Sequence, residues 1–109
     1  MMGEQTLFCG VLVVQLKIPG AASLKDRRQV TRSLLERARR RLNVSSADLG
    51  PEGSFQDGFL AFSAVSSSPS EAGERLDSLL RMIRSMEEKG EFLLVREIKE
   101  VERYAGFQD

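Results

Sequence analysis

Basic side chains recur at helical spacing between Ser23 and Asn43, and residues of this type suit the binding of phosphate groups. The stretch holds eight of the sixteen Lys and Arg residues in the 109-residue chain, against only two acids. With 100° per residue, five of the eight form a basic row on one side of a predicted helix: Lys25, Arg28, Arg32, Arg39 and Arg40. Arginine predominates, which favours bidentate phosphate contacts, whose strength depends on salt and hardly on sequence. The alternative is an ordinary solvated helix face, because the chain as a whole is formally neutral.

Other kinds of chemistry are restricted by composition. The chain has no histidine and a single cysteine, Cys9. It therefore lacks Ser-His-Asp and Cys-His pairs, histidine metal sites, and the thiolates for a metal or iron–sulfur cluster. We expect no cofactor and no metal.

A small phosphate-binding enzyme, by fold analogy with acylphosphatases, is a weaker alternative. The loop from Pro19 to Ser23 leads into a helix N-terminus with Lys25, Arg27 and Arg28 nearby, and such a terminus can hold an anion. However, the loop has one glycine, Asp26 would repel an anion, and no nucleophile and base are paired. We expect a protein that is not an enzyme.

The basic helix has a clear local start and a clear buried face. Ser23 is placed as the N-cap, and Asp26 three residues later completes a capping box. The Arg27 side chain points into the apolar arc. We expect its aliphatic stem to lie on the core edge and its guanidinium head to emerge at the helix end. Glu36 could pair with Arg32 or Arg40. The apolar arc expected to face the core comprises Leu24, Val30, Thr31, Leu34, Leu35, Ala38 and Leu42.

Residues Leu7 to Ile18 are predicted to form a strand, because they are too apolar and β-branched for a surface helix. The even-numbered residues form its core face. The opposite face is apolar at Cys9, Val11 and Val13 and polar beyond them, as expected of a sheet face that is partly open or used for self-association. We expect these three residues to form an interface in a homodimer.

The same sheet face is a poor RNA-recognition motif. Such a motif needs a basic residue, a glycine and aromatic rings two residues apart on one face, for stacking on bases. Here Asp57 and Gly58 precede Phe59 and Phe62, so the charge is wrong and the rings fall on opposite faces.

The remaining elements complete an α+β pattern. Short and long strands are predicted at residues 44–49 and 56–66, and a second helix runs from Ser68 as N-cap to Gly90. Residues 91–104 begin as a strand, but apolar residues every third position allow either a bulge or a terminal helical turn. The order predicts a ferredoxin-like βαββαβ fold, a four-stranded antiparallel sheet with two helices on one face, as one domain over residues 1–109.

Location and charge distribution complete the expectations. No apolar run is long enough to span a membrane, no signal peptide is visible, and one cysteine fits a reducing compartment, so we expect a cytoplasmic protein without a membrane partner. Residues 24–43 carry a net charge of +6, while residues 44–70 and 71–109 carry −3 each. The acids either lie apart from the basic helix or cover it.

A family resemblance rests on the first helix and its flanks. Residues 18–28, IPGAASLKDRR, match an IPG-x-x-SLK-[DE]-[KR]-R helix start, and residues 41–45, RLNVS, match an RF-NVS-like exit. The chain thereby resembles the YlxP-like proteins, domain of unknown function 503. It departs from them at Leu42, where the family usually has Phe, and in the loop before the third strand, where Phe55 is the candidate for a usual aromatic residue.

The resemblance implies a small bacterial ferredoxin-like protein without an assigned activity, from genes that often neighbour those of translation initiation. We therefore expect a binding module for RNA or a ribosomal component that uses the basic row. The alternative is a protein-interaction or homodimerisation module that uses Cys9, Val11 and Val13.

Overall fold

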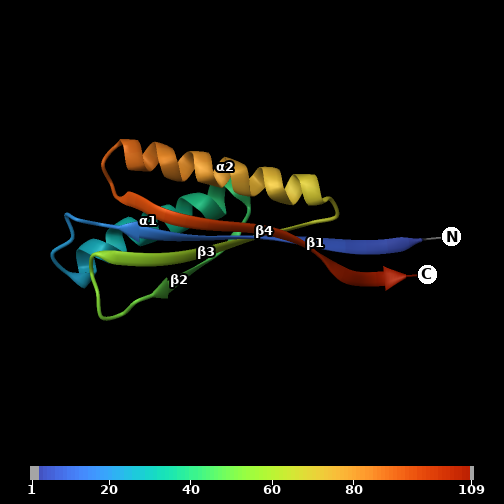
Figure 1. The fold of residues 1–109 in the computed structure, drawn as a ribbon, viewed down its shortest axis with the longest axis horizontal. Coiled ribbons are helices and arrows are strands. Elements are labelled where there is room, and N and C mark those ends of the chain that lie inside the picture. Colours follow the sequence, from blue (N-terminus) through green and yellow to red (C-terminus); the bar gives the residue numbers. More distant parts are fainter. Residues whose placement is uncertain (1–2, 109) are drawn as a thin grey trace.

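The computed structural model describes residues 3–108, which form four strands and two helices. Figure 1 shows them in chain order. The order of strands and helices is the predicted one, and the α+β class with two helices and an antiparallel sheet is confirmed. The elements are β1 Glu4–Lys17, α1 Leu24–Leu42, β2 Ser45–Gly50, β3 Asp57–Ser66, α2 Pro69–Glu88 and β4 Leu93–Gln108.

The strands form one sheet in the order β2-β3-β1-β4, and all three neighbouring pairs are antiparallel. The last segment is strand as far as Gln108, so the bulge alternative holds and the terminal helical turn does not. Its pairing with β1 shifts register between Gln15 and Leu16 and again between Gln5 and Leu7. Pairing along nearly the whole of β1 therefore keeps β4 extended in spite of these irregularities.

Both helices cover the same face of the sheet. The even-numbered residues from Gly10 to Leu16 of β1 and from Gly58 to Ala64 of β3 are buried, and two glycines on that face admit the helices closely. A Cβ on Gly10 would lie 2.7 Å from Leu76 Cδ1 of α2, and one on Gly58 would lie 3.5 Å from Thr31 Cγ2 of α1. The core between sheet and helices includes Leu12, Val14, Leu16, Leu34, Leu60, Phe62, Leu76, Leu79, Ile83 and Phe92.

The helices begin where the sequence predicts. The Ser23 hydroxyl accepts from the Asp26 N–H at 3.1 Å, and the Ser68 hydroxyl accepts from the Glu71 N–H at 3.3 Å. α1 ends at Asn43, which has a left-handed backbone (φ 51°) and donates its N–H to the Arg39 carbonyl. These local signals fix both ends of α1 and so fix which side of it carries the basic row.

The molecule is elongated because β1 and β4 extend beyond the other strands, as Figure 1 shows. Its principal extents are 59 × 26 × 22 Å. Within residues 3–108, the pairing of β1 with β3 ends at Phe8 and Ser66, whereas the pairing with β4 continues to Glu4 and Gln108. The face of the sheet opposite the helices, called the outer face below, has no covering layer in the described part of the chain.

Candidate functional site

Arg27 anchors α1 to the sheet edge. Its side chain is buried, and both terminal nitrogens donate to the Asp48 carboxylate of β2 at 2.9 Å. The Nε atom donates to the Asp57 carbonyl at 2.7 Å, and Nη2 also donates to the Gly50 carbonyl at 3.1 Å. The expectation that the Arg27 head emerges at the helix end is wrong, because a bidentate acid and two carbonyls satisfy the guanidinium inside.

The anchor also shapes the turn after β2. Gly50 has a positive φ of 94°, which glycine adopts at little cost, and its N–H donates to the Asp48 carboxylate at 2.9 Å. The hydrogen bonds from Arg27 lower the pKa of Asp48 most, with a further contribution from the Gly50 N–H. The same hydrogen bond, with Asp48, raises the pKa of Arg27. Both groups therefore stay charged, and Asp48 is neutralised by Arg27 and does not act as a free acid.

The structure places all five residues of the basic row in solvent. Arg39 also donates to the Ser46 carbonyl of β2 at 3.0 Å, which leaves its charge uncompensated. Over residues 3–108, no carboxylate forms an ion pair with any member of the row. The pairing expected of Glu36 with Arg32 or Arg40 is likewise not formed.

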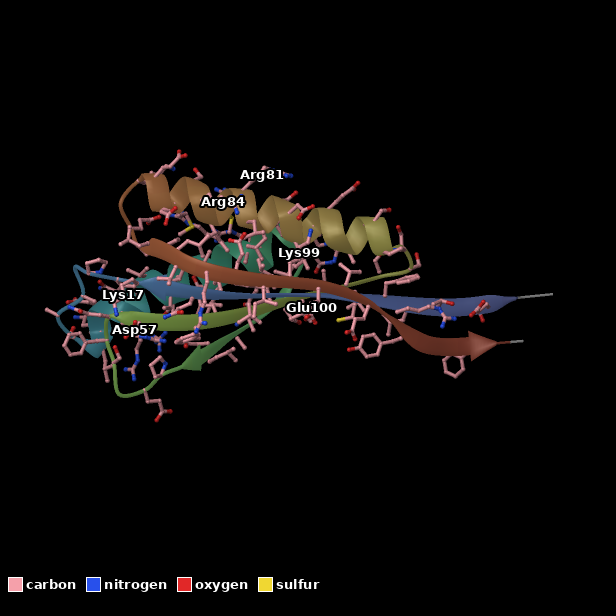
Figure 2. The ribbon with its side chains drawn as sticks, viewed as in Figure 1. Lys17, Asp57, Arg81, Arg84, Lys99 and Glu100 are labelled. Atoms are coloured by element: carbon pink, nitrogen blue, oxygen red, sulfur yellow. The ribbon has the colours of Figure 1, made fainter. Side chains whose placement is uncertain are left out.

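Three acids of the second half of the chain form ion pairs away from the basic row. Glu71 pairs with Arg75 at 2.7 Å and Asp77 pairs with Lys99 at 2.6 Å. Glu97 of β4 pairs with Arg84 of α2 at 2.8 Å, and Figure 2 shows the position of Arg84 on α2. Within residues 3–108, no acid of α2 forms an ion pair with the basic row, and the ion pairs of α2 lie within the helix or join it to β4.

Two adjoining hollows run between α1 and the turn after β2; we call them together the basic groove. The first, of about 800 Å³, is lined by Leu24, Arg27, Arg28 and residues 48–52. The second, of about 400 Å³, is lined by Arg28, Arg32, Glu36, Arg39 and Asp48, with Thr31 and Leu35 at its base. Arg28 and Asp48 belong to both. The structure therefore brings Arg28, Arg32 and Arg39 together, while Lys25 and Arg40 lie on α1 outside these linings.

The helix-start loop is less suited to an anion than the groove. The Ala22 N–H donates to the Asp26 carboxylate at 2.9 Å, and the Asp26 N–H is taken by Ser23. Arg27, the third cation expected nearby, is committed to Asp48. Several donors at this terminus are therefore occupied, and Asp26 itself would repel a phosphate.

The three predicted interface residues lie together on the outer face, in the middle of β1. Cys9 and Val13 are half-buried and Val11 is 37% exposed. Val11 and Val13 pair with Ser63 and Ala61 of β3. Apolar exposure thus continues across neighbouring strands.

The two phenylalanines of β3 lie on opposite faces. Phe62 is buried in the core, whereas Phe59 is half-buried and pairs with Gln15 on the outer face. Phe59 and Phe62 therefore do not form the pair of stacking rings that an RNA-recognition motif presents on one face.

Within residues 3–108 no group of three or more His, Cys, Asp or Glu side chains is placed to hold a metal ion. No helix there combines the length and apolar character needed to cross a membrane.

Sequence reasoning missed Asp48 and the turn at residues 49–52, which form one wall of the basic groove. It also placed Leu24 in the core arc, whereas Leu24 is 41% exposed and lines the groove. Leu24 is the first residue of α1 and lies beyond the sheet edge, so nothing covers it. The usable signal was Arg27, a charge inside an apolar arc, which requires an acidic partner nearby.

The comparison with protein families settles membership. A model described as protein of unknown function (DUF503) matches residues 9–96. The chain belongs to the DUF503 family. The DUF503 match begins within β1 and ends within β4, so it includes α1 with the whole basic row and both walls of the basic groove. No curated protein matches the chain.

Proposed function

We propose that this protein is a non-enzymatic binding module that contacts RNA, free or within a ribosomal component, through the basic row on α1. One observation carries the proposal: five exposed cations on one helix have no acidic ion-pair partner in residues 3–108, although three acids of α2 and β4 form ion pairs elsewhere. Unpaired cations on a rigid element attract a polyanion and release its counterions.

The geometry supports contacts with several phosphates. From Lys25 to Arg40 the helix rises about 22 Å, at 1.5 Å per residue. Arg28, Arg32 and Arg39 border the groove, whose uncompensated acids are Glu36 and Glu52, since Asp48 is neutralised by Arg27. The basic groove therefore keeps a positive charge and can recognise a backbone by shape and charge.

The direct test is binding of a fluorescent RNA stem-loop at low salt, measured by anisotropy. We expect wild type to bind and the variant Arg32→Glu with Arg39→Glu to bind roughly tenfold or more weakly, because two phosphate contacts become repulsive. A matched control reverses Arg81 and Lys89, two exposed cations of α2 and its C-cap, and so changes the net charge equally. Equal losses in both variants, or no binding by wild type, would refute the proposal.

We add to this proposal the type of fold, the family name and the location of the protein. The strand order β2-β3-β1-β4 with two helices on one face supports a ferredoxin-like fold. The helix-start motif of residues 18–28 supports the YlxP-like assignment. We propose a cytoplasmic location, where RNA and ribosomes are the available polyanions.

Protein interaction through the outer face is the second candidate function. Exposed apolar side chains favour it, among them Val11 (37% exposed), Val65 (55%) and Ile98 (59%). A contiguous apolar patch of this kind marks an interaction surface more often than a free one.

A further inference from the structure

The outer face of β4 carries charges of opposite sign at equal distances from a central apolar residue. Arg96, Ile98 and Glu100 pair with Gln15, Val13 and Val11 of β1, all on the outer face. The residues between them face α2, where Glu97 pairs with Arg84 and Lys99 with Asp77. Figure 2 shows Lys99 and Glu100 on opposite sides of β4.

These two outer charges are uncompensated. Arg96 donates its Nε to the Gln15 side-chain oxygen at 2.6 Å, which is a neutral partner. Glu100 has no hydrogen-bond or ion-pair partner within residues 3–108. By contrast, Lys17 and Asp57 on the same face neutralise each other at 2.8 Å.

The surface between Arg96 and Glu100 suits apolar packing. Ile98 is 59% exposed and borders a hollow of about 200 Å³ that is also lined by Val13 and Phe59. Sheets pack face to face with strand directions within about 30° of each other and with side chains interdigitating. An isoleucine from a facing sheet can fill such a hollow.

We propose that a second copy of this chain covers the outer face about a two-fold axis beside Ile98, with the two β4 strands antiparallel across the interface. Arg96 and Glu100 each lie two residues from Ile98, so reversing the strand direction sets Arg96 opposite the partner's Glu100, twice. The inference rests on the second candidate function, interaction through the outer face, and is independent of RNA binding by α1.

Charge swapping tests this arrangement directly. In R96E both facing positions are acidic, and in E100R both are basic, so each variant should dimerise roughly tenfold or more weakly than wild type in sedimentation equilibrium. An equimolar mixture of the two should recover dimers, because R96E and E100R chains restore both unlike pairs in a heterodimer. The double variant R96E/E100R, with wild-type composition and charge, should also recover dimerisation.

Matched controls are R81E and E88R, which make the same changes in net charge on α2. Both residues are exposed, and Figure 2 shows Arg81 on α2 away from the outer face. We expect both controls to dimerise as wild type does, alone and mixed. Circular dichroism of each variant verifies the fold.

Two outcomes overturn the proposal and are distinguishable. If wild type is monomeric at high concentration, both this dimer and self-association through the outer face fail. If a dimer forms that Val11→Lys dissociates but the charge swaps leave unchanged, the outer face is the interface and the two-fold arrangement at Ile98 is wrong.

Discussion

At the scale of single residues, Arg27 and Asp48 matter most for the integrity of the basic groove. Asp48→Asn should destabilise the protein by about 2 to 4 kcal/mol, because it leaves the guanidinium buried without its counter-charge while the remaining exposure of Asp48 moderates the cost. Urea unfolding measures the effect. Glu97→Gln, which breaks the exposed pair with Arg84, is the matched control and should cost less than about 1 kcal/mol.

The same carboxylate contributes to the acid sensitivity of the fold. The pKa of Asp48 is lower in the folded protein than its ordinary value, mainly through the Arg27 hydrogen bonds. Its contribution is therefore complete above about pH 4, near the unfolded-state pKa, and is lost as the pH falls through the folded-state pKa. Asp57 and Glu71, whose pKa values are also lowered, share this acid loss of stability. Stability measured from pH 6 to pH 2 should fall less steeply in Asp48→Asn, and an unchanged slope would contradict the assignment.

The sequence could show that Arg27 needs an acid but not which one. Asp48 lies 21 residues away, and only the placement of α1 on the sheet edge brings the two together. Likewise, the apolar spacing placed Leu24 in the predicted core, because helical periodicity carries no information on where the sheet ends. Both errors concern contacts that depend on tertiary placement.

At the scale of elements, α1 has one face that holds the fold and one that is free for binding. Leu34→Ala should destabilise by about 2 to 5 kcal/mol, since Leu34 is fully buried, whereas Arg32→Ala should cost less than about 0.5 kcal/mol. Leu24→Ala is the matched control, the same change at an exposed position of the same helix, and should cost much less than Leu34→Ala. Denaturant unfolding that ranks Arg32→Ala above Leu34→Ala would contradict the assignment of faces.

Element boundaries were predictable where local signals define them, and ambiguous where they do not. Ser23, Ser68 and Asn43 bound the helices through side-chain and backbone hydrogen bonds within a few residues. In β4, by contrast, Ile98 and Tyr104 face outward and Val101 inward, so the apolar residues recur every third position without a helix. Pairing with the distant β1 decides the conformation, and that information is not local.

At the scale of the whole molecule, the two surfaces proposed to bind partners lie on different layers, the basic row on α1 and the apolar outer face of the sheet. Val11→Lys should dissociate any homodimer in sedimentation equilibrium without lowering the urea midpoint, because Val11 is already partly exposed. RNA affinity per chain should be retained in this variant, since α1 is untouched. Loss of the fold or of RNA binding would show that the two surfaces are not independent.

The overall antiparallel α+β arrangement followed from the order of strands and helices, because two strand-helix-strand units with right-handed crossovers leave few alternatives. The distribution of charge over the folded surface could not be predicted from the order of strands and helices. A net +6 over residues 24–43 is compatible with a covered or an uncovered helix. Only the structure places Asp77 beside Lys99 and Glu71 beside Arg75 and shows the basic row without an ion pair in residues 3–108.

The salt dependence of RNA binding tests the central claim, that the basic row binds phosphates, most directly. With five contacts, the logarithm of the association constant of wild type should fall against the logarithm of KCl concentration with a slope of about −4. Arg32→Glu with Arg39→Glu should flatten that slope by about two, while the control with Arg81 and Lys89 reversed keeps the wild-type slope. An identical slope for wild type and the α1 variant, or no measurable affinity of wild type at the lowest salt, would contradict the account.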